Sequence, residues 1–185
     1  SGTAFGIRRM IDLTTNELDP EIVGHKPLIL VVDDQPANIQ TLGALLVQAG
    51  YDVMPATSGE QALARARTRM PVLILLDVLM PEMDGFAVLA ALRADELLKI
   101  IPVIFITAAQ ERDWLVRAFD AGAVDYVIKP FVHAELLARV RAHSDLTLTR
   151  SHLERKVREC DDLTQIVAHD LKGPLSGIQF SAALL

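Results

Sequence analysis

One short apolar run that ends on a carboxylate constrains the fold more than any other feature of this sequence. Residues 73–76 read Leu-Ile-Leu-Leu, Asp77 follows them, and Pro81 comes shortly after. The run is too short for a core helix, and its unbroken apolar character is typical of a strand that is buried on both faces. The sequence therefore predicts a central strand with Asp77 at its carboxyl end, the edge where open parallel α/β sheets bind ligands.

Three further short segments share this pattern, and each is followed by a polar or charged side chain. They are the apolar runs 28–32 before Asp33 and Asp34 and 103–106 before Thr107, and the segment 125–128, which begins with an Asp, before Lys129. At the tips of parallel strands these side chains would converge on one pocket. Carboxylates that close together are costly unless a cation joins them. Oxygen ligands with open coordination positions favour a hard ion, Mg²⁺ or alternatively Mn²⁺.

Helical periods alternate with the strands and predict the fold class. Apolar residues recur at helical spacing after Pro36, Ser58, Asp84, Glu111 and Phe131, and residues 51–56 supply one more short strand. Five strands that alternate with helices predict a doubly wound α/β fold, with a five-stranded parallel sheet covered on both faces. No glycine-rich loop follows a strand, which argues against Rossmann or P-loop phosphate binding.

The segment from about Lys26 to His143 resembles a receiver domain of the response regulator family. The resemblance rests on the acidic pair, on Asp77 with the following Met-Pro-Glu-Met-Asp-Gly, on Thr107-Ala108 and on Lys129-Pro130-Phe131. It implies a flavodoxin-like fold. It also implies that Asp77 accepts a phosphoryl group, that Thr107 and Lys129 contact that group, and that the Lys129-Pro130 bond is cis.

The same resemblance implies a metal site and a switch position. Asp34 would bind Mg²⁺ directly, Asp33 would reach the ion through water, and Asp77 and the Leu79 carbonyl would complete the protein ligands. Tyr126 matches the aromatic switch position of the family. An upstream histidine kinase or a phosphotransfer protein is the expected partner.

Composition excludes several other classes of protein. The chain has 185 residues, a net charge of −6 and scattered Lys and Arg, so nucleic-acid binding is not expected. Cys160 is the only cysteine, which favours a reducing cytosol over a disulfide framework. No apolar run approaches the roughly 20 residues that cross a bilayer. We therefore expect a cytoplasmic protein.

The last helical pattern does not stop where a receiver domain should end. From Phe131 to Gly173 there is neither proline nor glycine, and so long a pattern without caps is typical of a coiled coil. A heptad seam follows steps of four and three: Leu153, Val157, Cys160, Thr164, Val167, Leu171, Pro174 and Ile178. We expect a parallel homodimer; the alternative is one amphipathic helix folded back on its receiver.

This helix carries a second candidate site. With Val167 and Leu171 in the seam, His169 falls at the outermost heptad position beside Asp170, which suits a nucleophile reached by an external catalytic domain. The run from Val167 to Leu175 resembles the phosphoacceptor box of histidine kinases. That resemblance implies that His169 is phosphorylated from ATP and that Asp170 acts as its acid/base; Gly173 departs from the Asn or Thr common in that family.

These patterns predict four segments. Residues 1–26 form an arm that is mobile or vector-derived, 27–143 the receiver, 144–166 a coiled-coil linker helix, and 167–185 a truncated first helix of a kinase dimerisation and phosphotransfer domain. No nucleotide-binding box of the kinase family is present. We therefore expect a fragment of a hybrid kinase whose ATP-binding domain is an absent partner, so that enzyme activity of this chain stays an open question.

Three functional hypotheses remain open at this point. The receiver acts as an input that controls His169 through the continuous helix, or His169 and Asp77 exchange a phosphoryl group as a phosphorelay. In the third hypothesis the coiled coil serves dimerisation alone.

Overall fold

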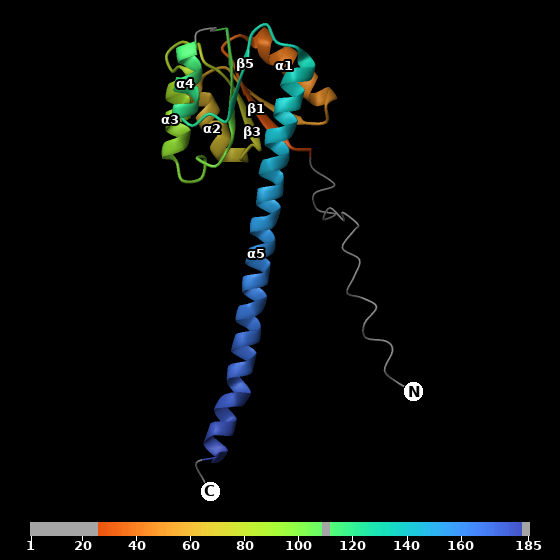
Figure 1. Cartoon of the computed structure of the whole chain (residues 1–185), viewed down its shortest axis with the longest axis vertical. Helices are drawn as coiled ribbons and strands as arrows, with labels where there is room; N and C mark the ends of the chain where they lie inside the picture. The colour runs from red at the N-terminus through yellow and green to blue at the C-terminus, as the bar shows by residue number, and fades with distance from the viewer. Residues whose placement is uncertain (1–25, 109–111, 183–185) are drawn as a thin grey trace, which may run out of the picture.

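The computed structural model describes residues 26–108 and 112–182, and it describes side chains in those ranges except at 112–115 and 162–182. An α/β domain lies at one end of the molecule, and one long helix leads away from it (Figure 1). Nearly all of the predicted N-terminal arm lies outside the described residues. Within the described part, no helix combines the length and the apolar character needed to cross a membrane.

The sheet has five parallel strands, as the sequence predicted. They are β1 (Leu28–Val32), β2 (Asp52–Ala56), β3 (Leu73–Asp77), β4 (Val103–Thr107) and β5 (Asp125–Ile128). Their order across the sheet is β2-β1-β3-β4-β5, and every neighbouring pair is parallel. The order reverses at β1, whose neighbours are β2 on one side and β3 on the other, so the topological switch point lies between β1 and β3.

Helices follow the strands and begin where local chemistry favours it. They are α1 (Pro36–Gln48), α2 (Gly59–Arg69), α3 (Gly85–Ala94), α4 (Arg112–Asp120) and α5 (His133–Ala182). Proline stands in the first turn of α1, where no backbone donor is needed. Ser58 and Asp84 cap α2 and α3 by accepting hydrogen bonds from the backbone N–H groups of Gln61 and Ala87.

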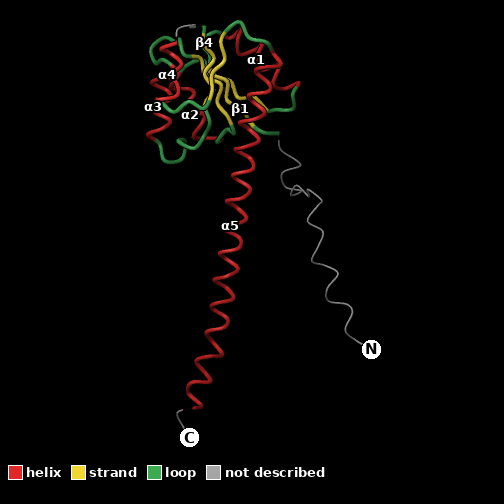
Figure 2. The backbone as a smooth tube through the Cα atoms, in the orientation of Figure 1, coloured by secondary structure: helices red, strands yellow, loops and turns green. Residues whose placement is uncertain are grey.

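Both faces of the sheet are covered, which explains why its strands are apolar throughout. Alternate strand residues such as Leu30 and Ile74 pack with α2 and α3 in one core cluster. The intervening residues, such as Val31 and Leu75, pack with α1 and the first turns of α5 in a second cluster. Figure 2 shows the strands between these two helical layers.

Helix α5 is far longer than the domain that it covers. It has 50 residues and therefore measures about 75 Å at 1.5 Å per residue. Leu136 and Val140 are fully buried against the sheet, and the buried Tyr51 hydroxyl lies 3.2 Å from the Ser144 hydroxyl. The C-terminal part of the helix extends away from the domain (Figure 1), and Leu153 and Val157 are each 59% exposed.

Candidate functional site

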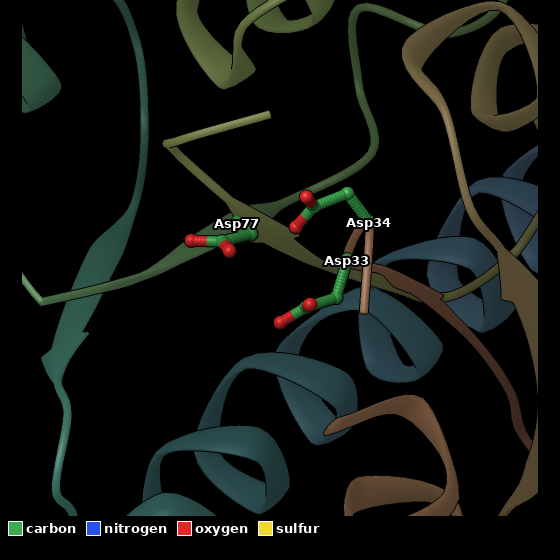
Figure 3. Close-up of side chains that lie close together, drawn as sticks. All are labelled: Asp33, Asp34 and Asp77. Carbon is green, nitrogen blue, oxygen red and sulfur yellow. The ribbon is translucent and has the colours of Figure 1, made fainter. Parts of the chain in front are cut away.

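Three carboxylates meet at the switch point of the sheet. Asp33 and Asp34 directly follow β1, and Asp77 ends the adjacent β3. One carboxylate oxygen from each residue lies within 4.8 Å of the other two, and Figure 3 shows the three side chains grouped at this edge. The structure thus brings together the three acids that the sequence singled out. Their roles stay predictions.

Asp33 is held firmly by its neighbours. It is 1% exposed, and its Oδ1 accepts hydrogen bonds from the Gln35 backbone N–H and the Asn38 amide, both at 2.9 Å. Its Oδ2 accepts from the Asn38 amide at 3.0 Å and from Lys129 Nζ at 2.8 Å. Both oxygens are therefore engaged by protein donors.

Asp34 differs from its neighbour. Its Oδ1 is buried and has no hydrogen-bond partner among the described residues. A buried carboxylate oxygen without a partner is costly, so its presence on a residue of this acidic cluster favours a site for a cation.

Asp77 shares Lys129 with Asp33. Lys129 Nζ lies 3.2 Å from Asp77 Oδ2, and Asp77 is 6% exposed. Burial raises the pKa of the Asp77 carboxyl, and the charge of Asp33 raises it further, which outweighs the opposing effect of Lys129. Burial alone would lower the pKa of Lys129, but its hydrogen bond to Asp33 and the charge of Asp77 raise it above its ordinary value. One ammonium is thus stabilised by two carboxylates.

The remaining predicted residues lie on β4, on β5 and in the loops that follow β3 and β5. Thr107 is buried at the end of β4, and its carbonyl accepts a 2.7 Å hydrogen bond from the Lys129 backbone N–H. The Lys129-Pro130 peptide bond is cis, as expected. The Tyr126 ring packs edge-on against Phe119, with 6.0 Å between ring centroids. A hydrogen bond from the Leu79 backbone lowers the pKa of Asp77 but does not offset burial.

The loop after Asp77 depends on a glycine. A Cβ atom on Gly85 would overlap the Asp77 carbonyl oxygen and come within 2.9 Å of Val78 Cα. The Gly85 backbone N–H also donates to the Val78 carbonyl at 2.9 Å. The loop that carries Leu79 therefore lies directly against the start of α3.

Sequence reasoning missed Asn38 and a second polar cluster. Asn38 stands in the first turn of α1, and its place just after the acidic pair was the available signal. Asp125 at the start of β5 accepts from Arg139 Nη1 at 2.6 Å and lies 3.3 Å from His143 Nε2. Burial would raise the pKa of Asp125, but the hydrogen bond from Arg139 and further donors lower it. These contacts fasten α5 to the sheet.

The second candidate site lies far along α5. His169 and Asp170 belong to the helix, but their side chains are outside the described part of the structure. Geometry therefore does not test their predicted roles.

The donor set fits a hard divalent cation. Asp33, Asp34 and Asp77 offer carboxylate oxygens, and Mg²⁺ is commonly held by a few carboxylates that leave coordination positions open. The unpartnered Asp34 oxygen is the donor that most needs such an ion.

Comparison with protein families agrees with this geometry. The model of the response regulator receiver domain matches residues 29–141, which is more than half of the chain. The chain belongs to the response regulator receiver family.

Individual relatives of the receiver agree with this assignment. The receiver region is 45% identical over 116 residues to the DNA-binding dual master transcriptional regulator RpaA of Synechocystis, a match that covers 63% of this chain and 48% of that protein. The first curated relatives are matched over only 28% to 59% of their own lengths.

Solved receiver structures share the fold. The chemotaxis protein CheY4 of Vibrio cholerae is 31% identical with a TM-score of 0.61, over 63% of this chain and 98% of that one. The receiver domain of a signal transduction histidine kinase from Syntrophus aciditrophicus is 34% identical with a TM-score of 0.60, over 64% and 90% of the two chains. Receiver domains of this family are phosphorylated by upstream histidine kinases.

Proposed function

We propose that this chain is the receiver and linker-helix part of a two-component signalling protein, and that Asp77 is its phosphoacceptor. The observation that carries the proposal is the meeting of Asp33, Asp34 and Asp77 within 4.8 Å, with one buried Asp34 oxygen that has no hydrogen-bond partner in the described part of the chain. The upstream partner is a histidine kinase or a phosphotransfer protein.

Asp34 is the direct metal ligand in this proposal. Both oxygens of Asp33 already accept hydrogen bonds from protein groups, which favours contact through water for that residue. Asp77 and the Leu79 carbonyl supply the other protein ligands. Bound Mg²⁺ would neutralise charge on the carboxylates and on an incoming phosphoryl group.

Asp77 itself is the nucleophile. Its carboxylate attacks phosphorus as the bond between phosphorus and the donor breaks, and the product is an acyl phosphate. Lys129 is placed to follow the new charge, because it already contacts Asp77 and Asp33. The Thr107 hydroxyl would then donate to a phosphoryl oxygen. The Tyr126 ring, which now packs edge-on against Phe119, would change its packing.

Helix α5 transmits the change in this proposal. It starts three residues after Pro130, packs on the sheet through Leu136 and Val140, and continues as one helix to Ala182. A rotation or register shift at its start would therefore reach the distant end without a flexible joint. The exposed Leu153 and Val157 belong to a heptad seam, which favours a parallel homodimeric coiled coil.

We extend the proposal to His169 as a kinase phosphoacceptor with Asp170 as its acid/base. Residues 144–166 would be the linker, and 167–185 the start of a dimerisation and phosphotransfer helix served by the ATP-binding domain of a longer kinase. The likeness of this receiver to that of a Syntrophus histidine kinase supports this placement.

A Mg²⁺ titration followed by calorimetry tests the metal site. We expect Asp34→Asn to weaken binding about tenfold or more, since ligand charge sets affinity in such sites, and the exposed edge-strand variant Asp52→Asn to match the wild type. Equal affinity in all three proteins would refute Asp34 as a ligand.

A phosphorelay between His169 and Asp77 is the rival reading, and transfer assays separate the two. If a chain phosphorylated at His169 passes the group to wild-type receiver but not to Asp77→Asn, phosphate flows between the sites. If no transfer occurs while a small phosphodonor labels Asp77, the receiver is an input module.

A further inference from the structure

A groove lies where α5 leaves the receiver. It encloses about 430 Å³ between the α3–β4 connection and the start of β5 on one side and α5 on the other. Ile100 and Val124 on the receiver wall are 52% and 37% exposed, and Leu146 on the helix wall is 67% exposed. Three apolar side chains therefore face water around one concave surface.

The helix wall of this groove continues the heptad seam. Leu146 and Arg150 line the groove, and they precede Leu153 and Val157 in the same alternation of four and three residues. The seam that the coiled coil requires thus begins beside the receiver. A helix that packs on this seam has to pass along the groove.

We propose that α5 of a second copy of this chain occupies the groove, so that each receiver packs against the helix of its partner. The inference rests on the parallel dimer proposed above and adds the receiver wall to its interface. Ile100 and Val124 would lose their exposure to water in the dimer. The receiver would then act on the dimer directly, in addition to acting through its own helix.

The side of the helix that faces the groove determines which residues of the second copy come near. Thr147 and Glu154 line the groove together with Leu146 and Arg150. With Leu146 at position d of the heptad, Thr147 and Glu154 both occupy position e, on one flank of the seam. In a parallel coiled coil this flank faces the opposite flank of the other helix. The opposite flank carries the exposed Thr149, and the exposed Asp145 lies beside that flank, one turn closer to the start of the helix and one position further from the seam.

Charge favours the same occupant. Arg93 and Lys99 line the receiver wall, and Arg93 keeps its guanidinium there by donating to the carbonyls of Gly122 and Ile101. Asp145 of the second copy would approach this cationic wall. Arg150 is the charged residue of the seam, and Glu154 of its own helix pairs with it at 2.8 Å.

Disulfide cross-linking tests the contact in the full chain. In a Cys160→Ser background, the double variant Val124→Cys/Thr149→Cys should form a disulfide between copies, seen as a dimer on a non-reducing gel. Each single variant should stay monomeric on the gel. The pair Val124→Cys/Arg155→Cys, which uses an outer heptad position, is the matched control and should not cross-link.

A second experiment measures how much the receiver wall of the groove contributes to dimerisation. Ile100→Ser with Val124→Ser should weaken dimerisation about tenfold in sedimentation equilibrium, because apolar surface would no longer be buried. Leu97→Ser is the control, since Leu97 is exposed but outside the groove lining. A wild-type dimer that neither cross-links nor responds to the wall variants overturns this inference alone. A wild-type monomer overturns the proposed coiled-coil dimer as well.

Discussion

Asp33 and Asp77 compete for one ammonium group. Lys129 lies within 3.2 Å of both carboxylates, and Asp34 brings a third acid to the cluster. The three carboxylates thus carry more negative charge than Lys129 neutralises. Such excess charge destabilises the folded chain but prepares it to bind a cation.

Removing one charge should stabilise the protein. We expect Asp77→Asn to raise the free energy of unfolding at pH 7 by about 1 kcal/mol, a shift of roughly 2–4 °C in Tm. The pKa of Asp77 is raised in the folded state, so the wild type recovers stability as the pH falls toward the ordinary value of 3.8. Thermal unfolding at pH 7 and pH 4 checks both points; a destabilised variant at pH 7 would contradict them.

Gly85 should tolerate no side chain. We expect Gly85→Ala to lower the free energy of unfolding by about 2 kcal/mol and to weaken Mg²⁺ binding, because its Cβ would displace the Asp77 backbone. Gly43→Ala is the matched control. Gly43 also lies in a helix, α1, and a Cβ atom there would meet only Val53 Cγ1, at an ordinary contact distance of 3.8 Å. Urea unfolding compares the two variants, and equal stability would show that the loop can shift.

The site acids could be read from the sequence because each ends an apolar strand, and strand ends of a parallel sheet meet at one edge. Asn38 could not be read in this way. Its amide contacts Asp33 only because the first turn of α1 returns over β1, and an Asn in a first helical turn is common for other reasons.

At the scale of elements, Asp125 joins β5 to α5. Arg139 donates to it at 2.6 Å and also to Glu135 at 2.9 Å. His143 approaches the other oxygen of Asp125. These contacts therefore hold α5 against β5 at Asp125, the residue that precedes the proposed switch residue Tyr126.

Breaking this connection should loosen α5. We expect Arg139→Leu to lower the free energy of unfolding by about 1–2 kcal/mol, because a half-buried carboxylate loses its main donor. The pKa of Asp125 is lowered in the folded state, so this contribution is present above its ordinary value of 3.8 and is lost as the pH falls below it. Urea unfolding at pH 7 measures the effect; the exposed Arg141→Leu is the control, and equal loss in both would contradict the role of Asp125.

Strands and helices followed from the sequence because apolar runs, caps and breakers agree locally. Ser58 and Asp84 cap the helices that they were expected to begin. The Asp125–Arg139 pair could not be foreseen, since the two residues are 14 positions apart on different elements. Only the packing of α5 across the sheet brings them together.

At the scale of the whole molecule, one helix connects the receiver to the second candidate site. The exposed seam and the groove beneath the receiver both lie on its course. The seam was predicted from heptad spacing in the sequence. The groove was not, because it depends on how the α3–β4 connection lies next to α5 in the folded protein. The predicted coiled coil along this helix is part of the proposed function.

The sole cysteine reports on this proposed coupling. Cys160 is exposed and lies in the seam, so mild oxidation should join two copies of the chain. We expect beryllofluoride with Mg²⁺, an aspartyl-phosphate mimic, to change the rate of cross-linking several-fold by shifting the helix. Arg155→Cys in a Cys160→Ser background is the control at an outer position. An unchanged rate at Cys160 would argue against transmission through α5.

Phosphoryl transfer to Asp77 tests the central claim most directly. The wild-type chain is incubated with acetyl phosphate and Mg²⁺, its intact mass is measured, and the modified residue is mapped after borohydride reduction. The account predicts one added phosphoryl group at Asp77, and none in Asp77→Asn or when the metal is chelated. Labelling at another residue, or equal labelling without a divalent cation, would contradict it.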